Sequence, residues 1–292
     1  MDQAEQLRNL IKANSRPQRP LARVLTVTSG KGGVGKSNTS INLAIQFRKM
    51  GQKVIILDAD FGLANIEIMF GAVPKHNLSD LIYKGKNIKE IITWGPMEVG
   101  FISGGSGITG LSNLTLDNLR TIIQSLSQLD EMADTIIVDT GAGIADSVME
   151  FLVASSEILL VTTPEPTSIT DSYSLLKALS RHPQFIKEET RIKLVANKIQ
   201  KPGDGKILYE KLSTVAGKYL KTPMEYLGEV PEDSQLSRAV MQQKPVSMEF
   251  PRARSAQAYE QIAAILTDMP VEETDNRRGM ASFFSHIFNI KR

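Results

Sequence analysis

The feature that most constrains the fold is a glycine-rich loop between a strand pattern and a helix pattern. An apolar, β-branched run at 24–28 leads into a segment with the spacing G-x-x-x-x-G-K-S, and a helical apolar stripe follows it. This strand–loop–helix order is that of a P-loop, whose glycines let backbone N–H groups approach a polyphosphate at a helix N-terminus. Lys36 is then expected to reach the β- and γ-phosphates, and the Ser37 hydroxyl to bind Mg²⁺. The loop residues are Gly30, Lys31, Gly32, Gly33, Val34, Gly35, Lys36 and Ser37. Lys31 is a second lysine, which phosphate binding within one subunit does not require.

The composition of the chain excludes several classes of protein that could carry this loop. The chain has 292 residues with 41% apolar content, enough for one large α/β domain with appendages. It has no cysteine, which argues against disulfides and thiolate metal sites, and a net charge of +2, which argues against a broad nucleic-acid-binding surface. The polar, acidic N-terminus is not a secretory signal, and no apolar run approaches the ~18 residues that span a bilayer. We therefore expect a cytoplasmic protein.

Apolar runs alternate with helical patterns along most of the chain. This order predicts an α/β P-loop NTPase with a mostly parallel central sheet and helices on both faces. The helical patterns include 116–129 and 253–267, and two short helices are expected near 80–83 and 88–92. Trp94, the one tryptophan, is expected to be a partly buried anchor. The expected strands are 24–28, 53–57, 99–102, 135–139, 158–163, 191–196 and 226–231.

Carboxylates follow two of these strands. Asp58 and Asp60 end the run at 53–57, and Asp139 ends the run at 135–139 before a glycine-containing loop. Ligands of open α/β sheets bind at the carboxyl ends of the strands. The first two are therefore candidates for Mg²⁺ contact and for positioning the attacking water, and Asp139 is a candidate Walker B residue that holds Mg²⁺.

The segment Asn197-Lys198-Ile199-Gln200 bears on the choice of base. A guanine site would place an aspartate at the fourth position, where it accepts from the N1–H and the exocyclic amine, but this chain has Gln200 there. Asn197 can instead pair with the amine and a ring nitrogen of adenine. We therefore favour ATP over GTP.

Segments outside the ATPase pattern begin and end the chain, which divides into 1–20, 21–268 and 269–292. The first segment has a short helical pattern and then the linker Arg16-Pro17-Gln18-Arg19-Pro20. We call residues 1–20 the arm. It is expected to fold onto its own domain or a partner, or to remain a frayed terminus.

The last segment is an amphipathic helical pattern with basic residues at both ends. Such a helix is typical of a reversible membrane-surface anchor. Docking on its own domain and docking in a partner groove are the alternatives, and docking and membrane use can alternate. A core that looks complete without the tail favours the membrane. The apolar positions are Met280, Phe283, Phe284, Ile287, Phe288 and Ile290.

The motifs together resemble the MinD/ParA family of P-loop ATPases. Lys31 followed by Gly32 to Ser37 is similar to the family's deviant Walker A box, and 58–60 and 139–143 are similar to its switch segments. The match covers about 22–268. The tail resembles a MinD membrane-targeting helix. The arm resembles the activating motif of the FlhG group (also called YlxH or FleN), MinD-like regulators of flagellar number and placement.

This resemblance implies a set of roles. Lys31 would cross an ATP-dependent homodimer interface to the partner's phosphates, and Asp60 would orient the hydrolytic water. Ser37, Asp58 and Asp139 would support Mg²⁺. Asn38, Asn197 and Pro231 join the P-loop as expected nucleotide-binding residues. Asp2, Gln3, Leu7 and Arg8 carry the arm motif.

The resemblance also implies partners. The arm would stimulate the GTPase FlhF, other surfaces would contact the flagellar C-ring proteins FliM and FliY, and the tail would bind the inner face of the cytoplasmic membrane peripherally and reversibly. Three alternatives stay open: a MinD-type septum-placement ATPase, a ParA-like partition protein, and a scaffold that binds nucleotide without turnover.

Overall fold

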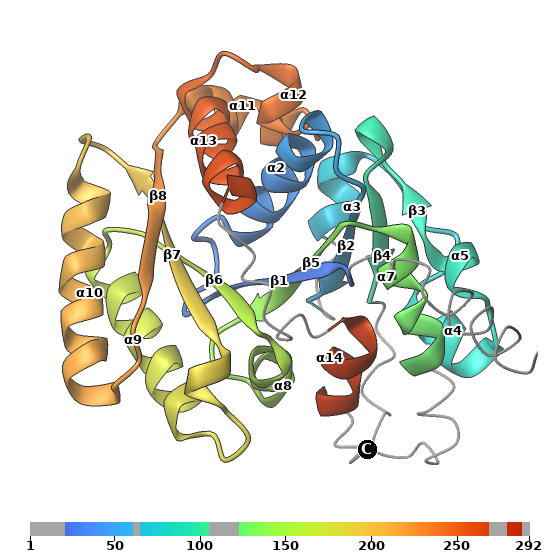
Figure 1. Ribbon diagram of the computed structural model, residues 1–292. Coiled ribbons are helices and arrows are strands. Elements are labelled where there is room, and N and C mark those ends of the chain that lie inside the picture. Colours follow the sequence, from blue (N-terminus) through green and yellow to red (C-terminus); the bar gives the residue numbers. More distant parts are fainter. Residues whose placement is uncertain (1–20, 61–64, 105–122, 269–278, 288–292) are drawn as a thin grey trace, which may run out of the picture.

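The computed structural model describes residues 21–60, 65–104, 123–268 and 279–287 (Figure 1). Its centre is an eight-stranded sheet in the order β3-β4-β2-β5-β1-β6-β7-β8. Every neighbouring pair is parallel except β3 and β4 at one edge, which confirms the mostly parallel sheet expected from the sequence. The strands are β1 (Arg23–Ser29), β2 (Val54–Ala59), β3 (Thr93–Trp94), β4 (Gly100–Ser103), β5 (Thr135–Ala142), β6 (Glu157–Thr162), β7 (Arg191–Ile199) and β8 (Glu225–Pro231).

Helices cover both faces of the sheet (Figure 1). One face carries α2 (Lys36–Lys49), α3 (Asn65–Phe70), α11 (Ser234–Met241), α12 (Val246–Glu249) and α13 (Arg254–Asp268). The other carries α4 (Leu78–Lys84), α5 (Ile88–Ile91), α7 (Leu129–Met132), α8 (Asp146–Ala154), α9 (Pro166–Arg181), α10 (Asp204–Leu220) and α14 (Met280–Ile287). Short 3-10 turns lie at η1 (Pro96–Glu98) and η3 (Lys187–Glu189).

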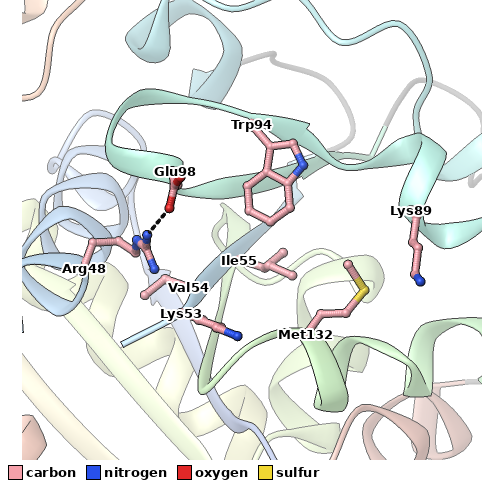
Figure 2. Close-up of a pocket in the computed structure, with 8 residues that line it drawn as sticks. All are labelled: Arg48, Lys53, Val54, Ile55, Lys89, Trp94, Glu98 and Met132. Atoms are coloured by element: carbon pink, nitrogen blue, oxygen red, sulfur yellow. Dashed lines mark hydrogen bonds and ion pairs between the residues drawn. The ribbon is translucent and has the colours of Figure 1, made fainter. Parts of the chain in front are cut away.

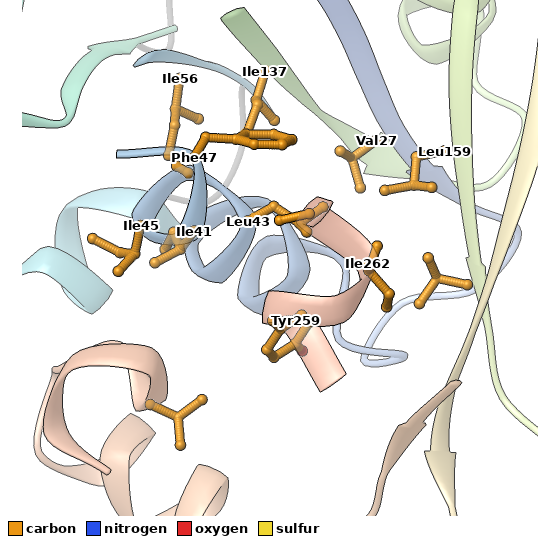
Figure 3. Packing of buried hydrophobic residues seen from close by; sticks show 14 of the residues in the cluster. Val27, Ile41, Leu43, Ile45, Phe47, Ile56, Ile137, Leu159, Tyr259 and Ile262 are labelled. Atoms are coloured by element: carbon orange, nitrogen blue, oxygen red, sulfur yellow. The ribbon is translucent and has the colours of Figure 1, made fainter. Parts of the chain in front are cut away.

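The strands bury side chains on both faces, as strands between two helical layers must. In β5, Ile137 faces the cluster around α2 and α13, whereas Ile136 and Val138 face the cluster around α8 and α14. Figure 3 shows the first cluster, in which Phe47 of α2 and Tyr259 of α13 are fully buried. This packing fixes the helix that follows the P-loop against the strand that precedes it.

Two sequence expectations differ from the structure or lie partly outside the described residues. Trp94 is more exposed than a partly buried anchor, because 56% of its surface is accessible in the two-residue edge strand β3. The helix expected at 116–129 lies partly outside the described residues, and its described part is helical over 123–127 and again at Leu129, the first residue of α7. The two short helices near 80 and 88 are confirmed as α4 and α5.

Candidate active site

The P-loop turns between the carboxyl end of β1 and the start of α2. Gly35 has φ 97°, in the left-handed region that glycine adopts most readily, and directly precedes the first helical residue, Lys36. A Cβ on Gly30 would lie 2.2 Å from the backbone of Asp171 in α9, so only glycine fits there. These contacts explain why the loop needs glycine at both positions. Among the other expected residues, Gly32 and Gly33 are exposed and Asn38 is half-buried.

Lys36 and Asp139 face each other under the loop. The Lys36 amino group is buried and lies 4.0 Å from Oδ1 of Asp139. The Ser40 hydroxyl donates to the same oxygen at 2.8 Å. Lys36 is thus held at the helix N-terminus, where its charge and the helix dipole both favour a phosphate.

The sheet register brings the expected metal ligands together. Asp58 of β2 pairs directly with Asp139 of β5, at the edge of the sheet that also carries the P-loop. Burial, and after it the charge of Asp139, raise the pKa of Asp58 to about 8, and burial also raises the pKa of Asp139. Among the described residues, one carboxylate oxygen of each, Asp58 Oδ2 and Asp139 Oδ2, is buried without a hydrogen-bond partner. Two buried carboxylates with unpaired oxygens are a site for a cation.

The donor set fits Mg²⁺. This ion usually binds through one or two carboxylates together with substrate phosphates and water, not in an all-protein cage. Ser37 supplies a hydroxyl beside Asp139 and forms a hydrogen bond that lowers its pKa. Ser37, Asp58 and Asp139 are therefore the residues that would hold the ion, where it would offset phosphate charge.

Asp60 differs from these two carboxylates. It is half-buried, its backbone N–H donates to Oδ1 of Asp58 at 3.1 Å, and the Asn65 side chain donates to its Oδ2 at 3.4 Å. A Cβ on Gly141 would lie 3.7 Å from Oδ1 of Asp60. Asp60 therefore reaches the carboxyl end of β5, where a nucleophilic water can meet it. Its role as the residue that orients that water stays a prediction.

The surplus lysine of the loop is bound within its own chain. The amino group of Lys31 lies 3.0 Å from Glu165 Oε2 and 2.8 Å from the Thr167 hydroxyl, at the start of α9. Hydrogen bonding to Lys31 lowers the pKa of the Glu165 carboxyl. Both side chains are well exposed, so this pair is weak and can exchange for another anion.

Asn197 does more than the sequence suggested. Its amide nitrogen donates to the Val34 carbonyl at 2.7 Å, and its amide oxygen accepts the Lys198 N–H at 2.9 Å. Each atom keeps one further hydrogen-bonding position, so the adenine contact stays a prediction. Pro231, the other expected contact, ends β8 and pairs with Ile199.

Lys198 was missed as a loop contact. Its amino group donates to the Gly33 carbonyl at 2.8 Å, and its backbone has φ 57°. A non-glycine residue in this region is uncommon and often marks a functional turn. In the sequence, the only sign of this hydrogen bond to the loop is the Asn-Lys pair at the end of a strand.

The tail is docked in this structure. Met280, Phe283 and Phe284 of α14 are buried in the cluster formed with α8, and the rings of Phe283 and Phe151 lie 5.9 Å apart. Ile287 is half-buried. The expectation that the core is complete without the tail is therefore wrong, because these side chains complete one face of the sheet. Phe288 and Ile290 lie outside the described residues, as do the arm residues Asp2, Gln3, Leu7 and Arg8.

Asp130 of α7 holds the first turn of α14. Its two carboxylate oxygens accept the Met280 N–H at 3.1 and 3.0 Å. The Asp130 carboxylate also accepts a hydrogen bond from the Ala22 N–H, just before β1. Within the described ranges, no helix combines the length and the apolar character needed to cross a bilayer.

Comparisons with known proteins identify the family of the nucleotide-binding domain. Residues 25–246 match the CobQ/CobB/MinD/ParA nucleotide binding domain family. The chain is 37% identical over 262 residues to the antiactivator FleN of Pseudomonas aeruginosa, covering 90% of this chain and 91% of FleN. It is 34% identical over 275 residues to the flagellum site-determining protein YlxH of Helicobacter pylori, covering 91% and 89%.

Solved structures show the same fold. The septum site-determining protein MinD of Pyrococcus horikoshii, complexed with Mg-ADP, superposes with a TM-score of 0.68 at 22% identity, covering 87% of this chain and 100% of that one. The Aquifex aeolicus MinC:MinD complex gives a TM-score of 0.65 at 22% identity, covering 84% of this chain and 96% of the solved one. The chain belongs to the MinD/ParA family of P-loop ATPases, in the group that contains FleN and YlxH.

Proposed function

We propose that this chain is an ATP-switched, membrane-associating regulator of flagellar number and placement. The observation that carries the proposal is the similarity to FleN and YlxH over about nine tenths of each chain. A comparison within one organism supports the flagellar role over septum placement. The chain is 34% identical to YlxH of Helicobacter pylori and 29% identical to MinD of the same bacterium.

The chemistry that we assign to the site is hydrolysis of ATP. Lys36 and the loop N–H groups bind the phosphates. Ser37, Asp58 and Asp139 would hold Mg²⁺, which would offset phosphate charge. Asp60 orients a water that attacks the γ-phosphorus. The bond from that phosphorus to the bridging oxygen of ADP breaks, and ADP and phosphate leave.

Lys31 makes this site a switch. Lys36 already serves the phosphates of its own subunit, so Lys31 is free to bind those of a second subunit across a symmetric interface. The contacts with Glu165 and Thr167 keep its charge compensated in the monomer. A γ-phosphate on the partner competes for the same amino group, which ties dimerisation to ATP.

Replacing Lys31 with alanine should abolish ATP-dependent dimerisation while the monomer still binds nucleotide, because Lys36 remains. Light scattering with and without ATP, on an Asp60→Ala background that holds ATP, measures dimerisation. Lys206→Ala, which removes an exposed lysine of α10, is the control and should dimerise normally. A Lys31→Ala protein that dimerises like the control contradicts the assignment.

The tail is the second element that we expect to change its contacts. The side chains that α14 buries against the domain are the ones that we assign to the membrane, so docking and membrane binding exclude each other. Each large apolar side chain that is fully buried contributes roughly 1.5–3 kcal/mol, and ordering of the helix offsets part of this. One tail therefore binds reversibly, and the two tails of a dimer bind together with much greater avidity.

Replacing Asp130 with alanine should favour the released tail. The change removes the acceptor at the N-terminus of α14, which stabilises a helix by about 1–2 kcal/mol, or roughly a 5- to 30-fold change in population. More protein should then float with phosphatidylglycerol vesicles. Glu131→Ala, an exposed neighbour on α7, is the matched control. Equal flotation of both variants would show that Asp130 does not hold the tail.

We assign the arm to a partner GTPase. It acts on FlhF, where Gln3 contacts phosphate or positions water, and the folded domain engages the C-ring proteins FliM and FliY. A synthetic peptide of residues 1–20 should raise GTP turnover by FlhF, and a Gln3→Ala peptide should raise it less. Turnover that the wild-type peptide leaves unchanged removes this part of the proposal.

The cellular role is tested by counting flagella. Deletion of the gene in its native host should change the number of flagella per cell, as seen by electron microscopy, and leave the division septum in place. Misplaced septa with normal flagella would instead support the MinD-type alternative. Salt-sensitive DNA binding by the purified protein would support a ParA-like role.

A further inference from the structure

A groove at the edge of the sheet lies far from the P-loop in the fold. It has a volume of about 640 Å³ and is lined mainly by Lys53, Val54, Ile55, Lys89, Trp94 and Met132. Figure 2 shows Trp94, Ile55 and Met132 around one space, with the two lysines beside it and the Arg48–Glu98 ion pair at one side. We call it the Trp94 groove. Its volume lies within the ordinary range of ligand pockets.

The groove is apolar at its floor and cationic at its rim. Val54 and Ile55 are almost fully buried, whereas Trp94 is 56% exposed. The Trp94 ring lies against the backbone at Gly100, where a Cβ would come within 3.2 Å of it. Within the described ranges, the amino groups of Lys53 and Lys89 have no ion-pair partner. The groove therefore suits an apolar segment that also brings a carboxylate.

We propose that the Trp94 groove is the docking site of the arm of this same chain. The path is short. Arg23, Thr135 and Val54 lie at one level on the adjacent strands β1, β5 and β2, so the groove begins two strands from the point where the arm joins β1. Strands are spaced ~4.8 Å apart, which puts Val54 roughly 10 Å from Arg23.

Backbone hydrogen bonds connect the two places directly. The Arg23 N–H donates to the Asp134 carbonyl at 2.9 Å, and the Asp134 N–H donates to the Lys53 carbonyl at 2.8 Å. Residues 12–20, which include the linker, can extend ~3.3 Å per residue, so these nine residues span roughly 30 Å, more than the distance requires. The arm therefore reaches the groove with slack.

The composition of the arm matches the lining. Leu7, Leu10 and Ile11 share one face of a helical pattern, and Asp2 and Glu5 supply carboxylates within the same ten residues. An amphipathic helix in an apolar groove is a common recognition mode. Because the arm is tethered, its effective concentration at the groove is on the order of millimolar, so even a weak fit is occupied.

Docking would withhold the arm from any other protein. The same three apolar residues cannot contact a partner while they cover Trp94. This inference concerns where the arm rests, and it holds or fails whatever the identity of the arm's partner.

Trp94 is the only tryptophan, so its fluorescence reports on the groove alone. In the full chain, a Leu7→Asp/Leu10→Asp variant should shift Trp94 emission to longer wavelength and increase acrylamide quenching relative to wild type. Asn9→Asp/Ala13→Asp adds the same charge off the apolar face and should behave like wild type. Identical emission and quenching in all three proteins would overturn the proposal.

The absence of cysteine allows a second, independent readout. An Ala4→Cys/Lys89→Cys protein should form an intramolecular disulfide under mild oxidation, and an Ala4→Cys/Lys211→Cys protein, whose second position is on α10, should not. The proposal requires this selectivity, and equal or absent cross-linking refutes it. Two other results would also refute it. If wild-type Trp94 emission shifts with protein concentration, the groove binds a second copy of the chain. If it shifts when phosphatidylglycerol vesicles are added and the leucine variant matches wild type, the groove binds lipid.

Discussion

Replacing Asp60 with alanine should lower the rate of ATP hydrolysis by about 100- to 1,000-fold and leave ATP affinity within a few-fold of wild type. A positioned side chain that assists the reacting water contributes about this much to catalysis. The structure separates Asp60 from the residues assigned to Mg²⁺, because it is half-buried and faces Gly141, whereas Asp139 is fully buried beside Lys36. The measurements are phosphate release for turnover and equilibrium titration for affinity.

Matched variants test that separation. Asp60→Asn keeps the shape and the contact with Asn65 but removes the charge, so it should lose nearly as much turnover as alanine. Asp139→Asn should instead weaken Mg²⁺-dependent ATP binding. If Asp60→Ala lowers affinity as much as turnover, Asp60 belongs with the metal ligands and its assignment to the water is wrong.

Local patterns in the sequence were enough to predict the sheet and the P-loop. Buried parallel strands are continuous apolar runs, and a glycine loop followed by Lys-Ser leaves few other structures. The placement of Asp58 beside Asp139 follows from strand order, which the general rule for open α/β sheets anticipates. These features are local or follow from the strand order, so a single sequence is enough to predict them.

Other features depend on tertiary contacts that a single sequence does not encode in any local pattern. The amphipathic tail has the same periodicity whether it covers a domain or a membrane, and only the open face beside Phe151 decides that Phe283 packs there. The hydrogen bond from Lys198 to the Gly33 carbonyl depends on a lysine whose backbone is in the left-handed region, and no residue propensity predicts that conformation. The exposure of Trp94 likewise results from its place in an edge strand.

A buried ion cluster connects the amino ends of neighbouring strands, at the end of the sheet opposite the P-loop. Glu157 of β6 accepts Arg23 Nε at 2.7 Å and Lys193 Nζ at 2.5 Å. The Lys193 side chain is 1% exposed. Arg23 also donates to the Leu266 carbonyl near the end of α13, so the cluster joins three strands and a helix. Burial alone would raise the pKa of Glu157, but the hydrogen bond and charge of Arg23 and the charge of Lys193 lower it from 4.5 to about 2.

Replacing Glu157 with alanine should therefore destabilise the fold by about 3–5 kcal/mol, because a fully buried lysine loses its ion pair with this carboxylate. At about 2–4 °C per kcal/mol for large domains, the melting temperature should fall by roughly 10 °C.

Since the folded-state pKa of Glu157 lies below the ordinary 4.5, the stabilisation by this carboxylate is present above that pH and is lost as pH falls toward 2. The difference between wild type and variant in thermal unfolding should thus be largest at neutral pH and shrink below pH 4.5. Glu225→Ala, at the exposed start of β8, is the control and should shift the melting temperature little at any pH. Equal effects of the two substitutions would mean that the cluster does not stabilise the sheet, and a difference that grows on acidification would contradict the lowered pKa.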